Sequence, residues 1–210
     1  MRTRTFFRAL ALGWLPMIFI LGDLCNAQTA WTFPDFSATE VFPSNKADLE
    51  VKVSISGSNV RVDRSAAIAT LYAPSIKKVY SLTTYPDQSH QCVAMKPEQA
   101  RMMPSPLGLI QGQIVKRSDA GTEVVEGHPT KIQEVSVVGA DGKTIDSKVW
   151  EAEDLKGVPV KIESHIEGRT LIAVYRDIAI GAPDQGLFRV PDRCTPFEKM
   201  WQVARVRPAK

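Results

Sequence analysis

The segment that most constrains the fold runs from Gly121 to Ile162 and reads GTEVVEGHPTKIQEVSVVGADGKTIDSKVWEAEDLKGVPVKI. Its apolar and polar residues alternate with a period of two, separated by short turns that contain glycine, which is typical of β-strands. The pair Asp141-Gly142 favours a tight hairpin, because glycine tolerates the positive φ angles of that turn. No recognisable catalytic motif interrupts the segment. These features predict an antiparallel sheet that holds or presents something and does not transform it.

The first 27 residues have the three-part plan of a secretory signal peptide. Three arginines precede an apolar core from Ala9 to Leu21, and the small residues of Cys25-Asn26-Ala27 suit a signal peptidase. The apolar core is too short for a spanning helix, which needs about 20 residues. We therefore expect cleavage after Ala27 and a mature chain that is periplasmic or secreted. Lipid anchoring at Cys25 and an uncleaved membrane anchor are the alternatives.

The remaining chain, residues 28–210, has a length that suits a single domain. Removing residues 1–27 takes away three of the 26 basic residues and one of the 23 acidic ones, which leaves a net charge of +1. The sequence of residues 28–210 contains neither a basic cluster nor a second long apolar run. It therefore predicts no nucleic-acid binding, which needs a basic face, and no transmembrane segment after cleavage.

Two cysteines, Cys92 and Cys194, remain after cleavage, in a compartment that favours disulfide formation. A disulfide between them would close a loop of about 100 residues and stabilise the fold by about 4.7 kcal/mol in the chain-entropy model. It would also hold the C-terminal segment against the middle of the sheet. Two unpaired thiols, or a metal site formed by His90 and Cys92, are the alternatives, although His-x-Cys alone is a poor metal signature.

Strand patterns continue outside the opening segment. Residues Leu49–Ser56 alternate strictly, and Ala66–Tyr72, which includes Leu71, is apolar on both faces. The other expected strands are Val60–Asp63, Val79–Thr84, His90–Met95, Gln113–Arg117, Thr122–Glu126, Thr130–Val138, Thr144–Ala152, Pro159–His165 and Leu171–Ile180. About ten or eleven strands in an up-and-down meander predict a mainly β domain whose sheet curls. If the sheet does not close, its concave face must be filled by helices, loops or a ligand.

The strand pattern breaks between Pro97 and Gly112, where the chain reads PEQARMMPSPLGLIQG. We expect a short helix to begin at Pro97, with Glu98 in its first turn, and to end before the next prolines. The segment also holds the largest apolar cluster outside the strands, formed by Met102, Met103, Leu107, Leu109 and Ile110. This cluster is either a permanent cap on one open end of the sheet or a mobile lid over an apolar cavity, for which flexible methionines are well suited.

Enzymatic signatures are missing from the sequence. It has no G-x-S-x-G elbow and no H-E-x-x-H, P-loop or Rossmann fingerprint. The three histidines, His90, His128 and His165, lie in or beside expected strands, and we interpret them as surface or hydrogen-bonded residues. Glu153 and Asp154 are interpreted as solvated turn residues. We therefore expect no catalytic site, no cofactor and no metal.

Several short motifs occur in an order that resembles a known family. They are Asn59–Asp63, Ala66–Tyr72, Lys77–Leu82, Gly121–Glu123, Val125–Pro129, Val149–Ala152, Gly157–Ile162 and Leu187–Pro191. In this order they are similar to the LolA/LppX-like superfamily of periplasmic lipid and lipoprotein carriers, and more closely to a secreted branch of it. The likeness covers roughly residues 36–192.

The resemblance implies an unclosed β half-barrel with a helical lid over an apolar cavity that receives acyl chains. Arg61 falls on the strand where lipoprotein carriers place a cavity arginine. Leu71, Trp150 and the apolar cluster between Pro97 and Gly112 are the other expected ligand-binding residues. The leading hypothesis is a non-catalytic carrier or binding module for a lipid or an acylated protein. The alternative is a structural or protein-interaction module of the cell envelope with a solid core and no ligand.

Overall fold

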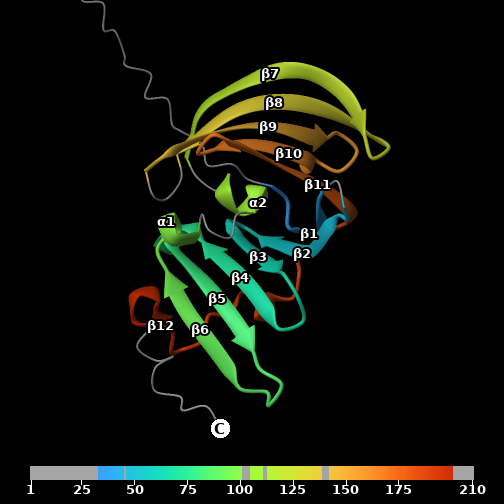
Figure 1. The fold of residues 1–210 in the computed structure, drawn as a ribbon. Helices are drawn as coiled ribbons and strands as arrows, with labels where there is room; N and C mark the ends of the chain where they lie inside the picture. The colour runs from blue at the N-terminus through green and yellow to red at the C-terminus, as the bar shows by residue number, and fades with distance from the viewer. Residues whose placement is uncertain (1–32, 45, 101–104, 111–112, 139–141, 201–210) are drawn as a thin grey trace, which may run out of the picture.

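The computed structural model describes residues 33–44, 46–100, 105–110, 113–138 and 142–200, which form one strongly curled, twelve-stranded sheet (Figure 1). The expected signal peptide and its cleavage site lie outside these residues. Six consecutive strands form an antiparallel meander in the first half: β1 (Phe36–Phe42), β2 (Leu49–Ser56), β3 (Asn59–Asp63), β4 (Ile68–Ala73), β5 (Lys78–Thr84) and β6 (His90–Met95).

The second half of the sheet is a second antiparallel meander. It comprises β7 (Gln113–Val125), β8 (His128–Val138), β9 (Thr144–Ala152), β10 (Val158–Ile166) and β11 (Arg169–Ile180). The two halves join where β1 pairs with β11, with Phe36 opposite Ile180 and Val41 opposite Val174. The strand order therefore starts at β12 and ends at β7, and the sheet does not close into a barrel.

Short elements connect and cover the sheet. Between the two meanders lie the helices α1 (Pro97–Ala100) and α2 (Pro106–Leu109). The remaining pieces are the 3-10 turns η1 (Pro74–Ile76), η2 (Gln185–Phe188) and η3 (Phe197–Lys199), and the two-residue strand β12 (Thr195–Pro196). None of the helices in the described ranges is long and apolar enough to cross a membrane.

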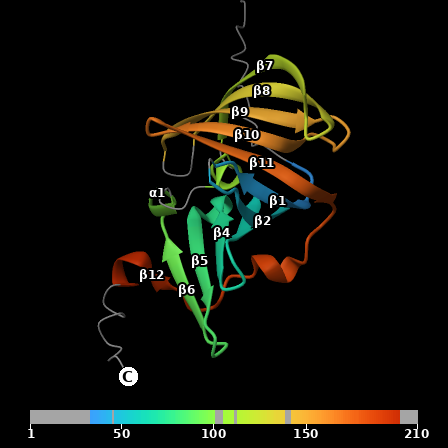
Figure 2. The ribbon, with the colours of Figure 1, turned by 45° about the vertical axis from the view of Figure 1, so that its right-hand side comes forward.

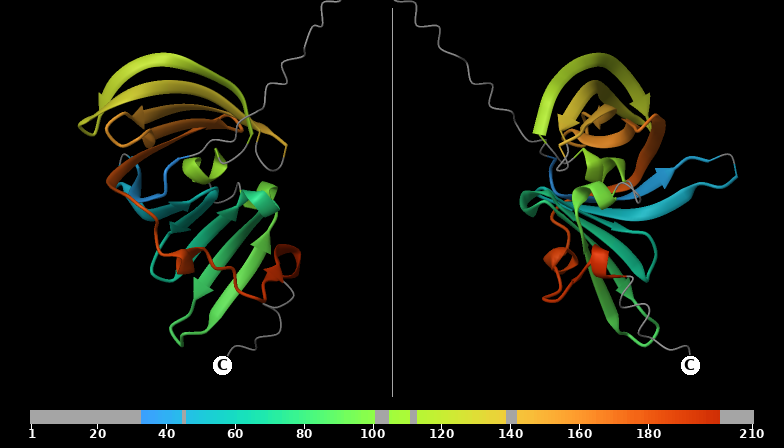
Figure 3. Two further views of the ribbon diagram at one scale, coloured as in Figure 1. Left: turned by 180° about the vertical axis from the view of Figure 1, so that it is seen from behind. Right: turned by 60° about the vertical axis from the view of Figure 1, so that its left-hand side comes forward.

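The main hydrophobic core lies on the concave side of the curled sheet, between the two halves. Figures 1 and 3 show α2 enclosed there, beneath the arch formed by β7 to β10 and above β3 and β4. Alternation along each strand sends every second side chain to this side. The fully buried members include Val53, Ile55, Val60 and Val62 from the first half and Val137, Val149, Ile162 and Ala173 from the second.

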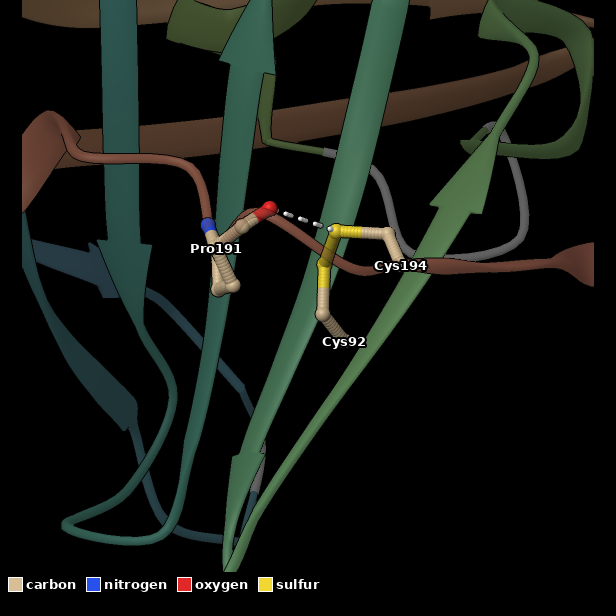
Figure 4. The surroundings of a disulfide bond; sticks show 3 residues. All are labelled: Cys92, Pro191 and Cys194. Carbon is tan, nitrogen blue, oxygen red and sulfur yellow. Dashed lines mark hydrogen bonds between the residues drawn. A yellow bond between two sulfur atoms is a disulfide. The ribbon is translucent and has the colours of Figure 1, made fainter.

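The opposite face of β4 to β6 has its own apolar layer, which the C-terminal segment covers (Figure 2). Leu71 and Tyr80 pack there with Cys92, against Phe188 and Val190 of that segment. Figure 4 shows the predicted disulfide between Cys92 and Cys194, whose Cα atoms are 4.6 Å apart, with the Cys194 sulfur 3.5 Å from the carbonyl oxygen of Pro191. The prediction that this bond forms and holds the C-terminal segment on the sheet is therefore confirmed. The predicted place, the middle of the sheet, is wrong, because β6 lies at the edge of the sheet beside the two-residue strand β12.

The predicted fold class is confirmed, with three differences in detail. The sequence did not predict β1, whose seven residues occupy the centre of the sheet. The two short strands expected between Gln113 and Glu126 are one strand, β7, in which two β-bulges absorb the irregular pattern. A helix does begin at Pro97 with Glu98 in its first turn, but a second one, α2, follows in place of the irregular segment.

Candidate functional site

The site is built around α2, a single helical turn whose local sequence explains why it forms. Ser105 is the N-cap, and its hydroxyl accepts a hydrogen bond from the backbone N–H of Gly108 at 3.5 Å. Pro106 occupies the first helical position, where its fixed φ suits the helix and its missing N–H costs nothing. Backbone bonds from Leu109 to Ser105 and from Ile110 to Pro106, both 3.0 Å, complete the turn.

The apolar side chains of α2 fill the middle of the concave face. Leu107 and Ile110 are fully buried within the main core, and Leu109 is half-buried. The helix contacts β3 from one half of the sheet and β10 and β11 from the other. A Cβ atom added to Gly108 would lie 2.8 Å from ring carbons of Tyr72, so only glycine lets the helix approach this closely. The concave face is thus occupied by a segment of the chain itself.

A buried carboxylate anchors α2 to the sheet. Glu40, on β1, is fully buried, and its Oε1 accepts hydrogen bonds from the hydroxyl of Ser105 at 2.9 Å and from that of Tyr175 at 2.8 Å. Its Oε2 is buried and has no hydrogen-bond partner within the part of the chain that the structure describes. A buried carboxyl oxygen without a partner is costly when it carries charge. The hydrogen bond from Ser105 therefore joins α2 to the sheet through a carboxyl group whose charged form is costly to bury.

Burial sets the ionisation of this cluster. Loss of water raises the pKa of Glu40 to about 7, against the opposing effects of the hydrogen bonds from Tyr175 and Ser105 and of the positive charge of Arg64. Burial likewise raises the pKa of Tyr72 to about 12 and that of Tyr175 well above its usual value, with the Glu40 charge adding to both. Both phenols stay neutral near pH 7, and Glu40 is the group that titrates there.

The predicted site residues separate into two groups. Leu107, Leu109 and Ile110 lie together on and beside α2, in the concave core or at its margin. Met102 and Met103 lie outside the described residues. The other three predicted residues, Arg61, Leu71 and Trp150, lie on the opposite face of the sheet, so the structure does not place them in the wall of a concave cavity.

Arg61 is held by the C-terminal segment. Its neighbours Val60 and Val62 point into the main core, which sends Arg61 to the other face. There its guanidinium lies 2.8 Å from the carboxylate of Asp63 and donates to the carbonyl oxygen of Leu187 at 2.8 Å. Leu71 stands opposite Arg61 in the β3–β4 pair and packs into the layer around Cys92. Both residues therefore stabilise the C-terminal cover.

Trp150 packs in a small cluster on the outside of the arch, with Ala152 and Val160. Its indole N–H donates to Glu123 Oε2 at 2.7 Å, and the ammonium of Lys161 lies 4.0 Å from the ring centroid. Trp150 thereby links β7, β9 and β10. Packing on a sheet face, which is the usual role of a tryptophan in a strand, accounts for Trp150 fully.

Three residues of the cluster beneath α2 were not predicted from the sequence: Glu40, Ser105 and Tyr175. The signal for Ser105 was available, because serine followed by proline is a common start to a helix. Glu40 shares the alternating face of Phe36 and Ala38, which are core residues, so a strand expected at Phe36–Phe42 would have shown a carboxylate pointing into the core. Tyr175 follows the same alternation from Ala173.

A depression lies on the outer surface near β1, β2 and β11 and has a volume of about 500 Å³. Its lining is largely charged, with Lys52, Asp63 and Asp177 among the contributors. The Lys52 ammonium donates to the Thr39 hydroxyl at 2.8 Å, which donates in turn to Asp177 at 3.0 Å. This open, self-paired surface does not suit an apolar ligand. Over the described ranges, His, Cys, Asp and Glu form no group of three or more that could hold a metal ion.

Comparison with known proteins gives distant structural likenesses. No protein-family model and no curated protein matches the sequence. Among solved structures, PNGF-II is similar over 78% of this chain, with 10% identity and a TM-score of 0.41, and the match spans only 31% of that protein. LprF from Mycobacterium bovis is similar over 71% of this chain and 89% of its own, with 13% identity and a TM-score of 0.36.

A LolA superfamily protein from Nitrosomonas europaea is also similar, over 76% of this chain and 90% of its own, with 8% identity and a TM-score of 0.30. At these identities and TM-scores, the likenesses carry no argument about ligand or activity.

Proposed function

We propose that this protein is a periplasmic or secreted, non-catalytic carrier or binding module for a hydrophobic ligand, either a lipid or the acyl chain of an acylated protein. The ligand would lie on the concave face of the sheet, in the place that α2 occupies, and α2 would be the gate. One observation carries the proposal: a single helical turn of four residues covers the centre of a concave face whose buried side chains are mostly apolar.

The energetics support a gate of this size. One helical turn has little stability of its own, so α2 stays in place chiefly through its side chains. Burying Leu107 and Ile110 is worth about 3 to 6 kcal/mol together, and the hydrogen bond from Ser105 to Glu40 adds about 1.5 to 3 kcal/mol if the carboxyl is charged. Each buried methylene of an acyl chain contributes about 0.8 kcal/mol. A chain of about ten methylenes would therefore offset the loss of α2 from the concave face.

The second candidate function is a structural or protein-interaction module with a solid core. A specific observation favours it as well, because Leu107 and Ile110 are fully buried and Gly108 fits tightly against Tyr72. In that case α2 packs permanently, and the same side chains serve only stability. The two functions differ in whether weakening the attachment of α2 increases ligand uptake.

Uptake of a fluorescent fatty acid, dansylundecanoic acid, tests the proposal, together with native mass spectrometry of the gently purified protein. We expect the protein to bind the probe, and Ser105→Ala to bind it about tenfold more tightly, because loss of the Glu40 bond raises the fraction of open molecules. Leu71→Ala is the matched control, since it removes a buried side chain from the opposite face of the sheet. It should lower stability without tightening binding.

The contrary result is equally clear. If no lipid is found with the protein, and neither the parent chain nor Ser105→Ala takes up the probe although both remain folded by circular dichroism, the solid-core function replaces the carrier function.

A further inference from the structure

The two edges of the sheet differ in how they are covered. At the β6 edge, β12 adds a parallel pair, with Thr195 opposite Val93, and the disulfide between Cys92 and Cys194 fastens it. At the other edge, β7 is the outermost strand (Figure 1), and within the described ranges it pairs with β8 alone. Its thirteen residues are exposed except for Ile114 and Val125, which are half-buried. A long open edge offers unpaired backbone groups to another strand.

The side chains of β7 are self-complementary in one arrangement. The strand carries Val115, which is 44% exposed, and Val124, which is 69% exposed, near its two ends. Lys116 and Glu123 lie just inside them. In an antiparallel pair of two β7 strands, centred between Asp119 and Ala120, Lys116 falls opposite Glu123 of the other copy. A parallel pair in register would instead place equal charges side by side, which is unfavourable.

A β-bulge makes this arrangement geometrically possible. Residues directly opposite each other in an antiparallel pair must point to the same face, and in a regular strand Lys116 and Glu123, seven positions apart, would not. The register of β7 shifts between Asp119 and Gly121, so that Lys116 pairs with Ser136 and Glu123 with Thr130. Those two partners are six residues apart on β8, which has no register shift of its own there. Lys116 and Glu123 therefore point to one face.

Glu123 is also held in position. Its Oε2 accepts the hydrogen bond from the indole of Trp150 at 2.7 Å, and its backbone carbonyl accepts one from the hydroxyl of Thr130 at 2.6 Å. A carboxylate fixed in this way loses less conformational entropy when it pairs with a lysine. The negative half of the complementary pair is thus organised before any second chain arrives.

From the open edge, the charge pattern and the bulge, we propose that two copies of this protein associate through their β7 strands, antiparallel about a twofold axis, and continue the sheet from one molecule into the other. The proposal does not depend on what the concave face binds, because the paired residues Lys116 and Glu123 lie at the exposed outer edge of the sheet. A twofold contact of this kind uses the same patch on both molecules.

Sedimentation velocity over a concentration series tests the proposal with Lys116→Glu, Glu123→Lys and the double variant. We expect the parent protein to form a concentration-dependent dimer. Each single reversal should weaken it by about tenfold or more, because the twofold axis creates two repulsive contacts, and the double reversal should restore it. Lys78→Glu, an exposed lysine on β5 in the other half of the sheet, is the control and should leave the dimer unchanged.

Three results would overturn the proposal. The first is a monomer at every concentration. The second is a dimer that Lys116→Glu does not weaken, since it would use another surface. The third is a dimer that both single reversals weaken and that the double variant does not recover. This result would exclude the antiparallel register, or it would show that β7 pairs with a different strand, such as another segment of the same chain.

Discussion

Replacing Glu40 by glutamine removes a carboxyl group that the fold buries completely beneath α2. Glutamine has nearly the same shape, and its side-chain oxygen can still accept the hydrogen bonds from Ser105 and Tyr175 that Glu40 Oε1 accepts at 2.9 and 2.8 Å. The substitution changes the ionisation at this position and leaves the packing in place. It therefore isolates the cost of burying a charge whose second oxygen has no partner among the described residues.

The sign and size of the effect follow from the raised pKa. Burial moves the pKa of Glu40 from 4.5 to about 7 in the folded protein. Between these two values the folded state binds the proton more tightly than the unfolded chain does, so the free energy of unfolding falls as the pH rises. At about 1.4 kcal/mol per pKa unit, the loss attributable to Glu40 is roughly 3 kcal/mol between pH 4 and pH 8. Below pH 4.5 the penalty is absent.

Urea unfolding at a series of pH values, followed by circular dichroism, measures this directly. The difference in unfolding free energy between Glu40→Gln and the parent protein should shift in favour of the variant by about 3 kcal/mol from pH 4 to pH 8. Any constant cost of burying the amide cancels from this comparison. Glu134→Gln, an exposed carboxylate on β8, corrects for the change in net charge. A difference that does not vary with pH would refute the reasoning, because Glu40 would then not carry a buried-charge penalty.

Reduction of the disulfide and one further substitution test the attachments at the two faces of the sheet. Reducing the Cys92–Cys194 disulfide, which spans 102 residues, should lower the free energy of unfolding by about 4 to 5 kcal/mol; equal urea midpoints with and without reductant would contradict this. Gly108→Ala should destabilise the protein by about 1 to 3 kcal/mol, because its Cβ would lie 2.8 Å from the buried Tyr72 ring. A stabilised variant, as helix propensity alone would give, would show that α2 does not pack as described.

The strands were largely predictable because most of them have one face toward the core and one toward solvent. Thr144–Ala152 and His90–Met95 have the same bounds in the structure as in the sequence prediction. β1 was not predictable in the same way, since it lies mid-sheet and is buried on both faces, with Glu40 on the core side. Polar residues in such a strand hide the periodicity on which the prediction rests.

Alternation shows which residues share a face but does not show which face is concave. Arg61, Leu71 and Trp150 were expected to line a cavity, yet each belongs to the opposite face. The face opposite the concave core also carries apolar layers, one around Cys92 and one around Trp150, so hydrophobicity alone does not distinguish the two faces. The direction of curl depends on the twist and bulges of the whole sheet, which no single strand reveals.

The helix α2 illustrates a different limit. Four residues are too few for a periodic pattern, and only the cap at Ser105 and the proline after it indicate a helix. Its position against Glu40 and Tyr175 depends on strands more than 60 residues away in both directions. The apolar cluster of the segment was recognisable, whereas its partners were not.

The location of a bound acyl chain tests the central proposal most directly. A fatty acid that carries a diazirine near its methyl end can be cross-linked to the protein with light and located by mass spectrometry of the peptides. If α2 is a gate, the adducts fall on side chains of the concave core, such as Val62, Tyr72 and Val149. Adducts confined to exposed residues such as Leu49 and Val124, or no adducts at all, would contradict the proposal and leave α2 as a fixed part of the core.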